Sequence, residues 1–264
     1  MATSATEFDN KITRWKQEME LPWAKLKYKL VQSNLAKHLS QIQMSILDAG
    51  GGNGFDSIPF ATQGHFVDIV DYSREMLADA QSRAMQVGAQ ERVATHLADV
   101  RDISNLFPNL QFDLILCHNV LQYVEDVPAL MKALSGLLKS NGIISIVSIN
   151  RYSTPYHAAF LGDNLAEAIT SLDSRVSKAK IFDANIVSYS ADEISQLLKN
   201  AGIVTERDYG IRCICDYWGN NERKSDPVIF EQIERLECAL TELHPYKLLA
   251  RYFQVVARKQ LNGI

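Results

Sequence analysis

Cysteine is scarce in this chain of 264 residues, and long apolar runs and an excess of basic charge are missing from it. Its four cysteines are too few for a disulfide scaffold. No stretch approaches the ~20 apolar residues of a membrane-spanning helix, and the N-terminal residues lack an apolar signal core. With 27 basic and 31 acidic residues the net charge is −4, so nucleic-acid binding would have to rest on a local patch. We therefore expect a soluble, cytoplasmic protein that does not bind membranes.

The spacing of cysteines and histidines does not predict a metal centre. Cys213 and Cys215 alternate along a predicted strand, so both side chains are expected on one side of it. No Cys or His pair elsewhere has the spacing of a zinc site. We therefore expect no metal.

Short apolar runs alternate with helical patterns through the middle of the chain. The composition is that of an ordinary globular protein, with 47% apolar and 22% charged residues. One helix is predicted from its N-cap Ser73 to Gly88, and another from Asp126 to about Lys139. The predicted strands are residues 45–51, 65–71, 92–99, 112–120 and 142–150. This alternation predicts an α/β fold with a doubly wound, mostly parallel sheet covered by helices on both faces.

The segments on either side of this middle part lack the regular alternation of short apolar runs and helical patterns. Residues 7–40 are amphipathic and indicate two helices broken near Pro22. They are expected to act as a lid or to pack on the sheet. Residues 151–189 carry scattered aromatic and basic side chains and are expected to be irregular.

The C-terminal quarter returns to regular patterns. A capping box at Ser190 predicts a helix that ends at Gly202, and a second helix starts at Asp226. Strands are predicted for residues 203–218 and 248–259. The chain thus divides into an N-terminal helical lid (1–43), a cofactor-binding core (44–150), a substrate-side insert (151–189) and closing helices and strands of the same domain (190–264).

Four of the thirteen glycines lie in one stretch between a predicted strand and a helix, Asp48-Ala-Gly50-Gly51-Gly52-Asn53-Gly54. Glycine permits positive φ and close approach of the backbone to a ligand, and open α/β sheets bind ligands at this edge. The G-x-G-x-x-G pattern of a dinucleotide site is absent, since Phe55 or Ser57 stands where the last glycine belongs. No Gly-Lys-Ser/Thr follows, so this is not a P-loop. A tight turn with spare glycines is the structural alternative.

Two carboxylates near this loop favour one kind of nucleoside ligand. Asp71 ends the next predicted strand, 17 residues beyond Gly54, where it can accept both hydroxyl protons of a ribose. Asp48 lies under the loop, where it would repel a phosphate but hold an ammonium group. A ligand with a ribose, an ammonium and no phosphate is S-adenosylmethionine.

The glycine stretch Asp48–Gly54 resembles the first motif of the class I S-adenosylmethionine-dependent methyltransferases. Asp71 matches the acidic residue that binds ribose in that family. Leu97-Ala-Asp99-Val100 is similar to the family's third motif, in which the acid accepts from the adenine amino group and the next N–H meets the ring. FDLILCHNVLQYVED (112–126) is similar to the fourth-strand motif and places His118 beside the methyl donor. The resemblance implies a Rossmann-like sheet of seven strands, the last one antiparallel between the fifth and the sixth. The implied cofactor residues are Lys27, Asp48, Gly50, Gly51, Gly52, Asp71, Tyr72, Asp99, Val100 and His118.

The C-terminal part is similar to the tRNA 5-carboxymethoxyuridine methyltransferases, which methylate the carboxylate of a modified wobble uridine. The similarity rests on Tyr209-Gly-Ile-Arg212, Asp216-Tyr217-Trp218, His244-Pro-Tyr246 and Ala250–Lys259. It implies that Lys27 is the N-terminal basic residue that helps to bind the cofactor. The family's dense lysine run after the fifth strand is reduced here to Arg175, Lys178 and Lys180. Because phosphate contacts supply most of the affinity for nucleic acid, this departure weakens the tRNA prediction but not the prediction of methyl transfer.

The resemblance suggests a catalytic set that would hold an acceptor carboxylate: His118, Arg212, Tyr217, Arg251 and Tyr252. Arginine suits a bidentate grip on a carboxylate, although both arginines could instead pair with Asp208 and Asp216. His118 could be a general base or a donor that orients the amino-acid end of the cofactor. The predicted partner is a tRNA or a small carboxylate; the alternatives are a small-molecule O- or N-methyltransferase and a non-catalytic protein that binds S-adenosylmethionine derivatives.

Overall fold

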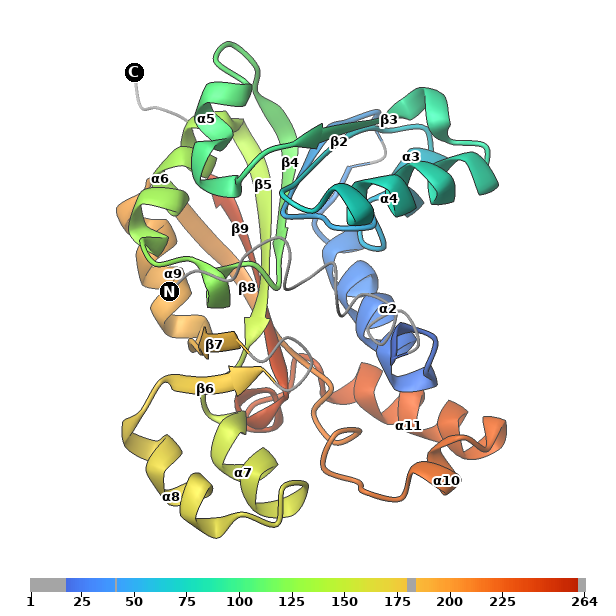
Figure 1. Cartoon of the computed structure of the whole chain (residues 1–264), viewed down its shortest axis with the longest axis vertical. Coiled ribbons are helices and arrows are strands. Elements are labelled where there is room, and N and C mark those ends of the chain that lie inside the picture. The colour runs from blue at the N-terminus through green and yellow to red at the C-terminus, as the bar shows by residue number, and fades with distance from the viewer. Residues whose placement is uncertain (1–17, 41, 180–183, 261–264) are drawn as a thin grey trace.

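Seven strands form one sheet at the centre of the protein, in the order β3-β2-β1-β4-β5-β9-β8 (Figure 1). The structure, a computed structural model, describes residues 18–40, 42–179 and 184–260. Strands β1 to β5 pair in parallel, and β9 is antiparallel to both β5 and β8. The predicted Rossmann-like sheet, with its last strand inserted beside the fifth, is thereby confirmed. The strands are β1 (Ser45–Ala49), β2 (Phe66–Asp71), β3 (Val93–Leu97), β4 (Phe112–His118), β5 (Leu138–Ile149), β8 (Ile203–Ile211) and β9 (Tyr252–Lys259).

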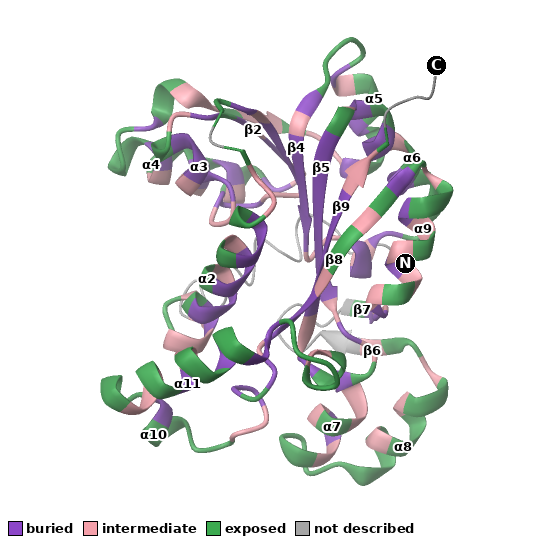
Figure 2. Cartoon of the chain, turned by 180° about the vertical axis from the view of Figure 1, so that it is seen from behind, coloured by how far each residue is buried: buried purple, intermediate pink, exposed green. Residues whose placement is uncertain are grey.

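Helices cover both faces of this sheet, as the alternating pattern predicted. One face packs against α5 (Ile103–Leu106), α6 (Val127–Leu137) and α9 (Ala191–Asn200). The other packs against α2 (Pro22–Ala36), α3 (Ile58–Thr62), α4 (Arg74–Gln86) and α11 (Pro227–Leu240). Figure 2 shows the central strands buried between these two layers. Shorter elements are α10 (Asn221–Lys224) and the 3₁₀ turns η1 (Gln90–Arg92), η2 (Val100–Asp102), η3 (Leu121–Tyr123) and η4 (Tyr246–Leu249).

Polar caps start the helices where the sequence predicted them. The Ser73 hydroxyl accepts from the Met76 N–H at the start of α4, and Asp126 does the same for Ala129 at the start of α6. Ser190 and Glu193 form a complete capping box at the start of α9. These side chains satisfy N–H groups that have no partner within the helix, which fixes each helix start locally.

Helix α2 is part of the core and not a detached cover. Its residues Leu26, Leu30 and Leu35 are almost fully buried against the sheet. Asn34 also donates to the Thr241 hydroxyl, just beyond α11. The predicted helix before Pro22 falls mostly on residues that the structure does not describe.

The prediction that residues 151–189 are irregular was wrong. They form the helix pair α7 (Ser153–Phe160) and α8 (Leu165–Asp173), followed by the hairpin β6 (Val176–Ala179) and β7 (Ala184–Val187). The Asn164 side chain caps α8 by accepting from the Glu167 N–H. Leu165, Ile169 and Leu172 of α8 recur at helical spacing, a signal that the sequence interpretation missed, and all three are exposed in the structure.

The predicted strand over residues 203–218 was too long. Strand β8 ends at Ile211 because Arg212 adopts a left-handed conformation with φ of 62°. Cys213 and Cys215 therefore lie in the loop beyond β8 and not on a strand. Strand β5 instead starts earlier than predicted, at Leu138, and includes Asn141 in a left-handed conformation with φ of 64°.

Among the described residues, none of the helices is both long enough and apolar enough to cross a membrane.

Candidate cofactor and acceptor site

The glycine loop follows β1 directly and leaves no room for side chains. Gly50 has a φ of 73°, a region that favours glycine. A Cβ atom at Gly51 would lie 2.3 Å from Cγ of Asp48, so only glycine fits above that carboxylate. The loop thus brings its backbone against the cavity at the carboxyl ends of the strands.

Asp71, at the end of β2, ties this loop to the start of α4. One carboxylate oxygen accepts the N–H of Gly52 at 2.9 Å, and the other accepts the N–H of Ser73 at 2.8 Å. Each carboxylate oxygen has a second lone pair, so the group can still accept from a ligand. The carboxylate is therefore held in one orientation at the edge of the cavity.

Asp99, just beyond β3, forms an ion pair with its neighbour Arg101. The guanidinium donates Nε to Oδ1 at 2.9 Å and Nη2 to Oδ2 at 2.6 Å. The hydrogen bonds from Arg101 lower the pKa of Asp99. Val100 follows, nearly buried, with its backbone in η2.

Asp48 forms the floor of the cavity and is 1% exposed. Within the described part of the chain its Oδ2 atom is buried without a hydrogen-bond partner. Burial, reinforced by the nearby Asp56, raises the pKa of Asp48 to about 7. A cationic ligand group at this atom would stabilise the ionised form.

His118, the last residue of β4, is held from two sides. Its Nε2 lies 2.8 Å from the Ser145 hydroxyl, which also accepts from Gln254. Its Nδ1 lies 3.2 Å from Oδ1 of Asp56. Burial alone would raise the pKa of Asp56, but the charges of His118 and Lys27 outweigh it and lower that pKa. Both ring nitrogens of His118 thus face protein groups.

Three cationic side chains surround Tyr252, the first residue of β9. The ring centre lies 5.3 Å from Nζ of Lys27, 5.3 Å from Cζ of Arg212 and 5.7 Å from Cζ of Arg251. Burial would raise the pKa of Tyr252, but Arg212, Arg251 and Lys27 together lower it. In the ranges that the structure describes, neither Lys27 nor Arg251 forms an ion pair, so this end of the site is cationic.

One cavity of about 520 Å³ connects these three regions. The ten residues predicted to bind the cofactor all line it: Lys27, Asp48, Gly50, Gly51, Gly52, Asp71, Tyr72, Asp99, Val100 and His118. Arg251 and Tyr252 from the predicted acceptor set line it as well. The structure therefore brings these side chains together, although their roles remain predictions.

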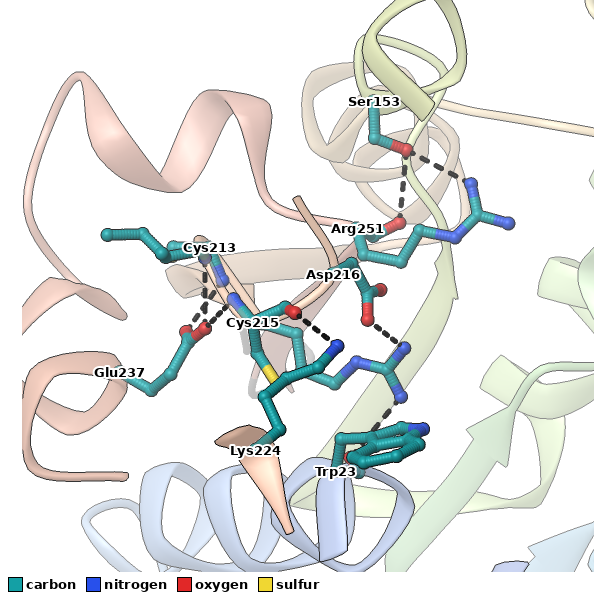
Figure 3. A network of polar contacts seen from close by, with 10 residues as sticks. Trp23, Ser153, Cys213, Cys215, Asp216, Lys224, Glu237 and Arg251 are labelled. Atoms are coloured by element: carbon teal, nitrogen blue, oxygen red, sulfur yellow. Dashed lines mark hydrogen bonds and ion pairs between the residues drawn. The ribbon is translucent and has the colours of Figure 1, made fainter. Parts of the chain in front are cut away.

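Arg212 and Tyr217 do not line this cavity. Arg212 donates to Asp216 and to the Trp23 carbonyl, two groups that Figure 3 shows on one side of the network. Among the described lining residues of the cavity, its guanidinium lies beside the ring of Tyr252. The Tyr217 hydroxyl donates to the Leu249 carbonyl. A direct grip of either side chain on an acceptor is therefore not supported by its position, and a role behind Tyr252 fits Arg212 better.

The sequence interpretation missed several lining residues. Asp56 follows the glycine loop, and its only sequence signal is a carboxylate beside that loop. Tyr28 stacks on Phe55 with ring centres 4.9 Å apart. The insert contributes His157 and Ala158 from α7 and Ile186 from β7, so it forms part of the cavity wall.

The side chains fit S-adenosylmethionine better than a phosphate-bearing nucleotide. The cavity offers carboxylates from Asp48, Asp71 and Asp99, and one of them has a buried oxygen that lacks a donor. Among the residues described, no cluster of three or more His, Cys, Asp or Glu could hold a metal ion.

Comparison with known proteins agrees with this geometry. The model of a methyltransferase domain family matches residues 40–206. The chain is 27% identical over 219 residues to the tRNA 5-carboxymethoxyuridine methyltransferase of Escherichia coli, covering 82% of this chain and 80% of that protein. It is 27% identical over 201 residues to a ubiquinone biosynthesis O-methyltransferase of Xylella fastidiosa, covering 76% and 75%. A crystal structure of magnesium protoporphyrin IX methyltransferase from Synechocystis with bound S-adenosylhomocysteine superposes with a TM-score of 0.61 at 17% identity, covering 94% of each chain.

The chain belongs to the methyltransferase domain family. It is a class I S-adenosylmethionine-dependent methyltransferase, and S-adenosylmethionine is its cofactor.

Proposed function

We propose that this enzyme transfers the methyl group to a carboxylate. The observation that carries the proposal is the guanidinium of Arg251, which lies on the cavity wall beside the ring of Tyr252 without an ion-pair partner among the described residues. The Arg251 guanidinium donates to the Ser153 hydroxyl at 3.4 Å (Figure 3) and lies 5.7 Å from the centre of the Tyr252 ring. A guanidinium in this state favours a bidentate grip on an incoming carboxylate.

For this reaction the protein needs mainly to position the acceptor oxygen relative to the methyl group of the cofactor. The cofactor supplies a methyl group already activated by a sulfonium. A carboxylate acceptor is ionised at neutral pH and needs no general base. Arg251 would hold it, and Tyr252 would orient it, so that the oxygen lies in line with the methyl group. Because such an acceptor needs no base, His118, whose Nε2 already lies 2.8 Å from the Ser145 hydroxyl, would orient the amino-acid end of the cofactor.

Each strand end would hold one part of the cofactor. Asp71 would accept from the ribose hydroxyls and Asp99 from the adenine amino group. Asp48 would accept from the ammonium, and Lys27 would face the carboxylate of the methionine moiety. The loop glycines Gly50, Gly51 and Gly52, with Tyr72, Val100 and His118, would complete the wall.

A wobble uridine of tRNA is the leading candidate for the acceptor. The similarity to the tRNA 5-carboxymethoxyuridine methyltransferase covers 82% of this chain and supports it. The described basic residues of the insert contribute little, since Arg151 and Arg175 both pair with Glu193. Phosphate contacts would therefore have to come from elsewhere on the surface.

The test uses the lability of the product. Tritiated methyl groups would be transferred from S-adenosylmethionine to tRNA carrying 5-carboxymethoxyuridine, and the product would be treated with mild alkali. We expect label that is released as methanol, because a methyl ester hydrolyses, and turnover at least tenfold lower in Arg251→Gln than in the wild type. Label that survives alkali would contradict a carboxylate acceptor.

The second candidate is O-methylation of a small hydroxyl compound. The helix pair that borders the acceptor side carries no Lys or Arg between Tyr152 and Ser174, while it carries Asp163, Glu167 and Asp173. Such a wall suits an uncharged small molecule better than a polyanion, and the similarity to ubiquinone O-methyltransferases agrees with it. Alkali-stable label on a small molecule, with none on tRNA, would favour this candidate.

A further inference from the structure

Asp56 carries the second buried carboxylate oxygen at the floor of the cavity. Its side chain is 14% exposed, and its Oδ1 atom is buried. That atom lies 3.2 Å from Nδ1 of His118, a long contact, and it receives no hydrogen bond of good geometry in the part of the chain that the structure covers. Oδ2 of Asp48 is likewise buried without a hydrogen bond of good geometry among the described residues, although the Ser57 hydroxyl lies beside that carboxylate. Buried acceptors without donors are rare in folded proteins, which points to a ligand that supplies the donors.

The charges around these two oxygens indicate which charges the ligand must carry. Asp48 and Asp56 lie close enough for the charge of Asp56 to raise the pKa of Asp48. Lys27, which is 8% exposed, lies close enough for its charge to lower the pKa of Asp56. Two carboxylates and one ammonium side chain thus line one part of the cavity. They complement a zwitterion whose own ammonium has three N–H donors to distribute.

We propose that Asp56 is a cofactor-binding residue, which together with Asp48 accepts hydrogen bonds from the ammonium group of S-adenosylmethionine. Lys27 faces the carboxylate of the same amino-acid end. The proposal rests on the cofactor placement given above, and it assigns to Asp56 a direct contact with the ligand as well as its contact with His118.

The test compares three ligands by isothermal titration. S-adenosylmethionine has the ammonium and the sulfonium, S-adenosylhomocysteine keeps only the ammonium, and methylthioadenosine has neither. We expect Asp56→Asn to raise the Kd of the first two by about tenfold each, because each loses a charged hydrogen bond. The Kd of methylthioadenosine should stay within about twofold of the wild type, since its contacts are made elsewhere.

Three other results would overturn the proposal. A loss confined to S-adenosylmethionine would mean that Asp56 acts on the sulfonium. An equal loss for all three ligands, with a lower Tm, would mean that the residue is structural. No loss for any ligand would mean that it makes no contact. The control is Asp113→Asn, whose carboxylate binds Ser45 and Lys139 outside the cavity and whose removal should leave all three Kd values unchanged.

A double-mutant comparison separates direct binding from an effect through His118. If Asp56 contacts the ligand, Asp56→Asn should still weaken S-adenosylhomocysteine binding by about tenfold in a His118→Gln background. Disappearance of the effect in that background would overturn the proposal. Asp71→Ala, which should weaken all three ligands, shows whether the underlying placement of the ribose holds.

Discussion

The carboxylate of Asp71 accepts the N–H of Gly52 at 2.9 Å, so the acid that ends β2 orients the glycine loop that ends β1. The same group is proposed to bind the ribose. Loop geometry and ligand recognition therefore depend on one side chain.

This double role predicts that removing the carboxylate is costly for binding. Asp71→Ala should raise the Kd of S-adenosylhomocysteine by about 100-fold, because ligand hydrogen bonds are lost and the Gly52 N–H loses its acceptor. Isothermal titration measures this directly. The isosteric Asp71→Asn should show a smaller loss, and near-native affinity in both variants would contradict the ribose assignment.

The space above Asp48 predicts that Gly51 cannot be replaced. Gly51→Ala places a Cβ atom 2.3 Å from Cγ of Asp48, so the loop or the carboxylate must shift. We expect loss of measurable cofactor binding and a lower Tm. Gly136→Ala is the control, since its Cβ would meet nothing within 4 Å inside α6, and alanine there should leave binding unchanged. Equal behaviour of the two variants would contradict this account of the loop.

The raised pKa of Asp48 predicts pH-dependent cofactor binding. Below its pKa of about 7 the free enzyme holds Asp48 protonated, whereas an ammonium group favours the ionised form. Affinity for S-adenosylhomocysteine should therefore rise as the pH increases from 6 to about 7 and then level off, with protons released on binding. Titrations in buffers of different ionisation enthalpy measure this release. Its persistence in Asp48→Asn would show that another group is responsible.

Removing the Glu237 carboxylate should lower the stability of the protein without a direct effect on methyl transfer. Its buried carboxylate accepts the backbone N–H groups of Cys213, Ile214 and Cys215 at 2.6, 2.9 and 2.7 Å and so fixes the loop after β8 (Figure 3). Glu237→Ala should lower the free energy of unfolding by about 3 kcal/mol, because three buried donors lose their acceptor. Denaturant unfolding measures the change. The control Glu234→Ala removes a partly exposed pair with Lys29 and should cost under about 1 kcal/mol.

The features that could be predicted from the sequence are those fixed by residues close together in the chain. Ser73 and Ser190 cap their helices through nearby backbone groups, and the glycine loop is a continuous motif, so the sheet, the helix starts and the positions of the proposed cofactor residues were accessible. These features depend on contacts close in the chain or on a pattern repeated at each strand end.

Long-range contacts explain what it could not predict. The contact of Asp56 with His118 joins the segment after the glycine loop to the end of β4, and the ring of Tyr252 near the C-terminus lies beside Lys27 in α2. The left-handed backbone at Arg212 ended β8 early and turned its side chain toward Asp216. Helix α8 is a different case, since the helical spacing of Leu165, Ile169 and Leu172 is local and was missed in the sequence.

A crystal structure of the enzyme with S-adenosylhomocysteine tests the central claim most directly. We predict the ribose hydroxyls on Asp71, the adenine beside Asp99 and Val100, and the ammonium between Asp48 and Asp56. A product bound elsewhere, or one whose amino-acid end points away from Asp48, would contradict the account.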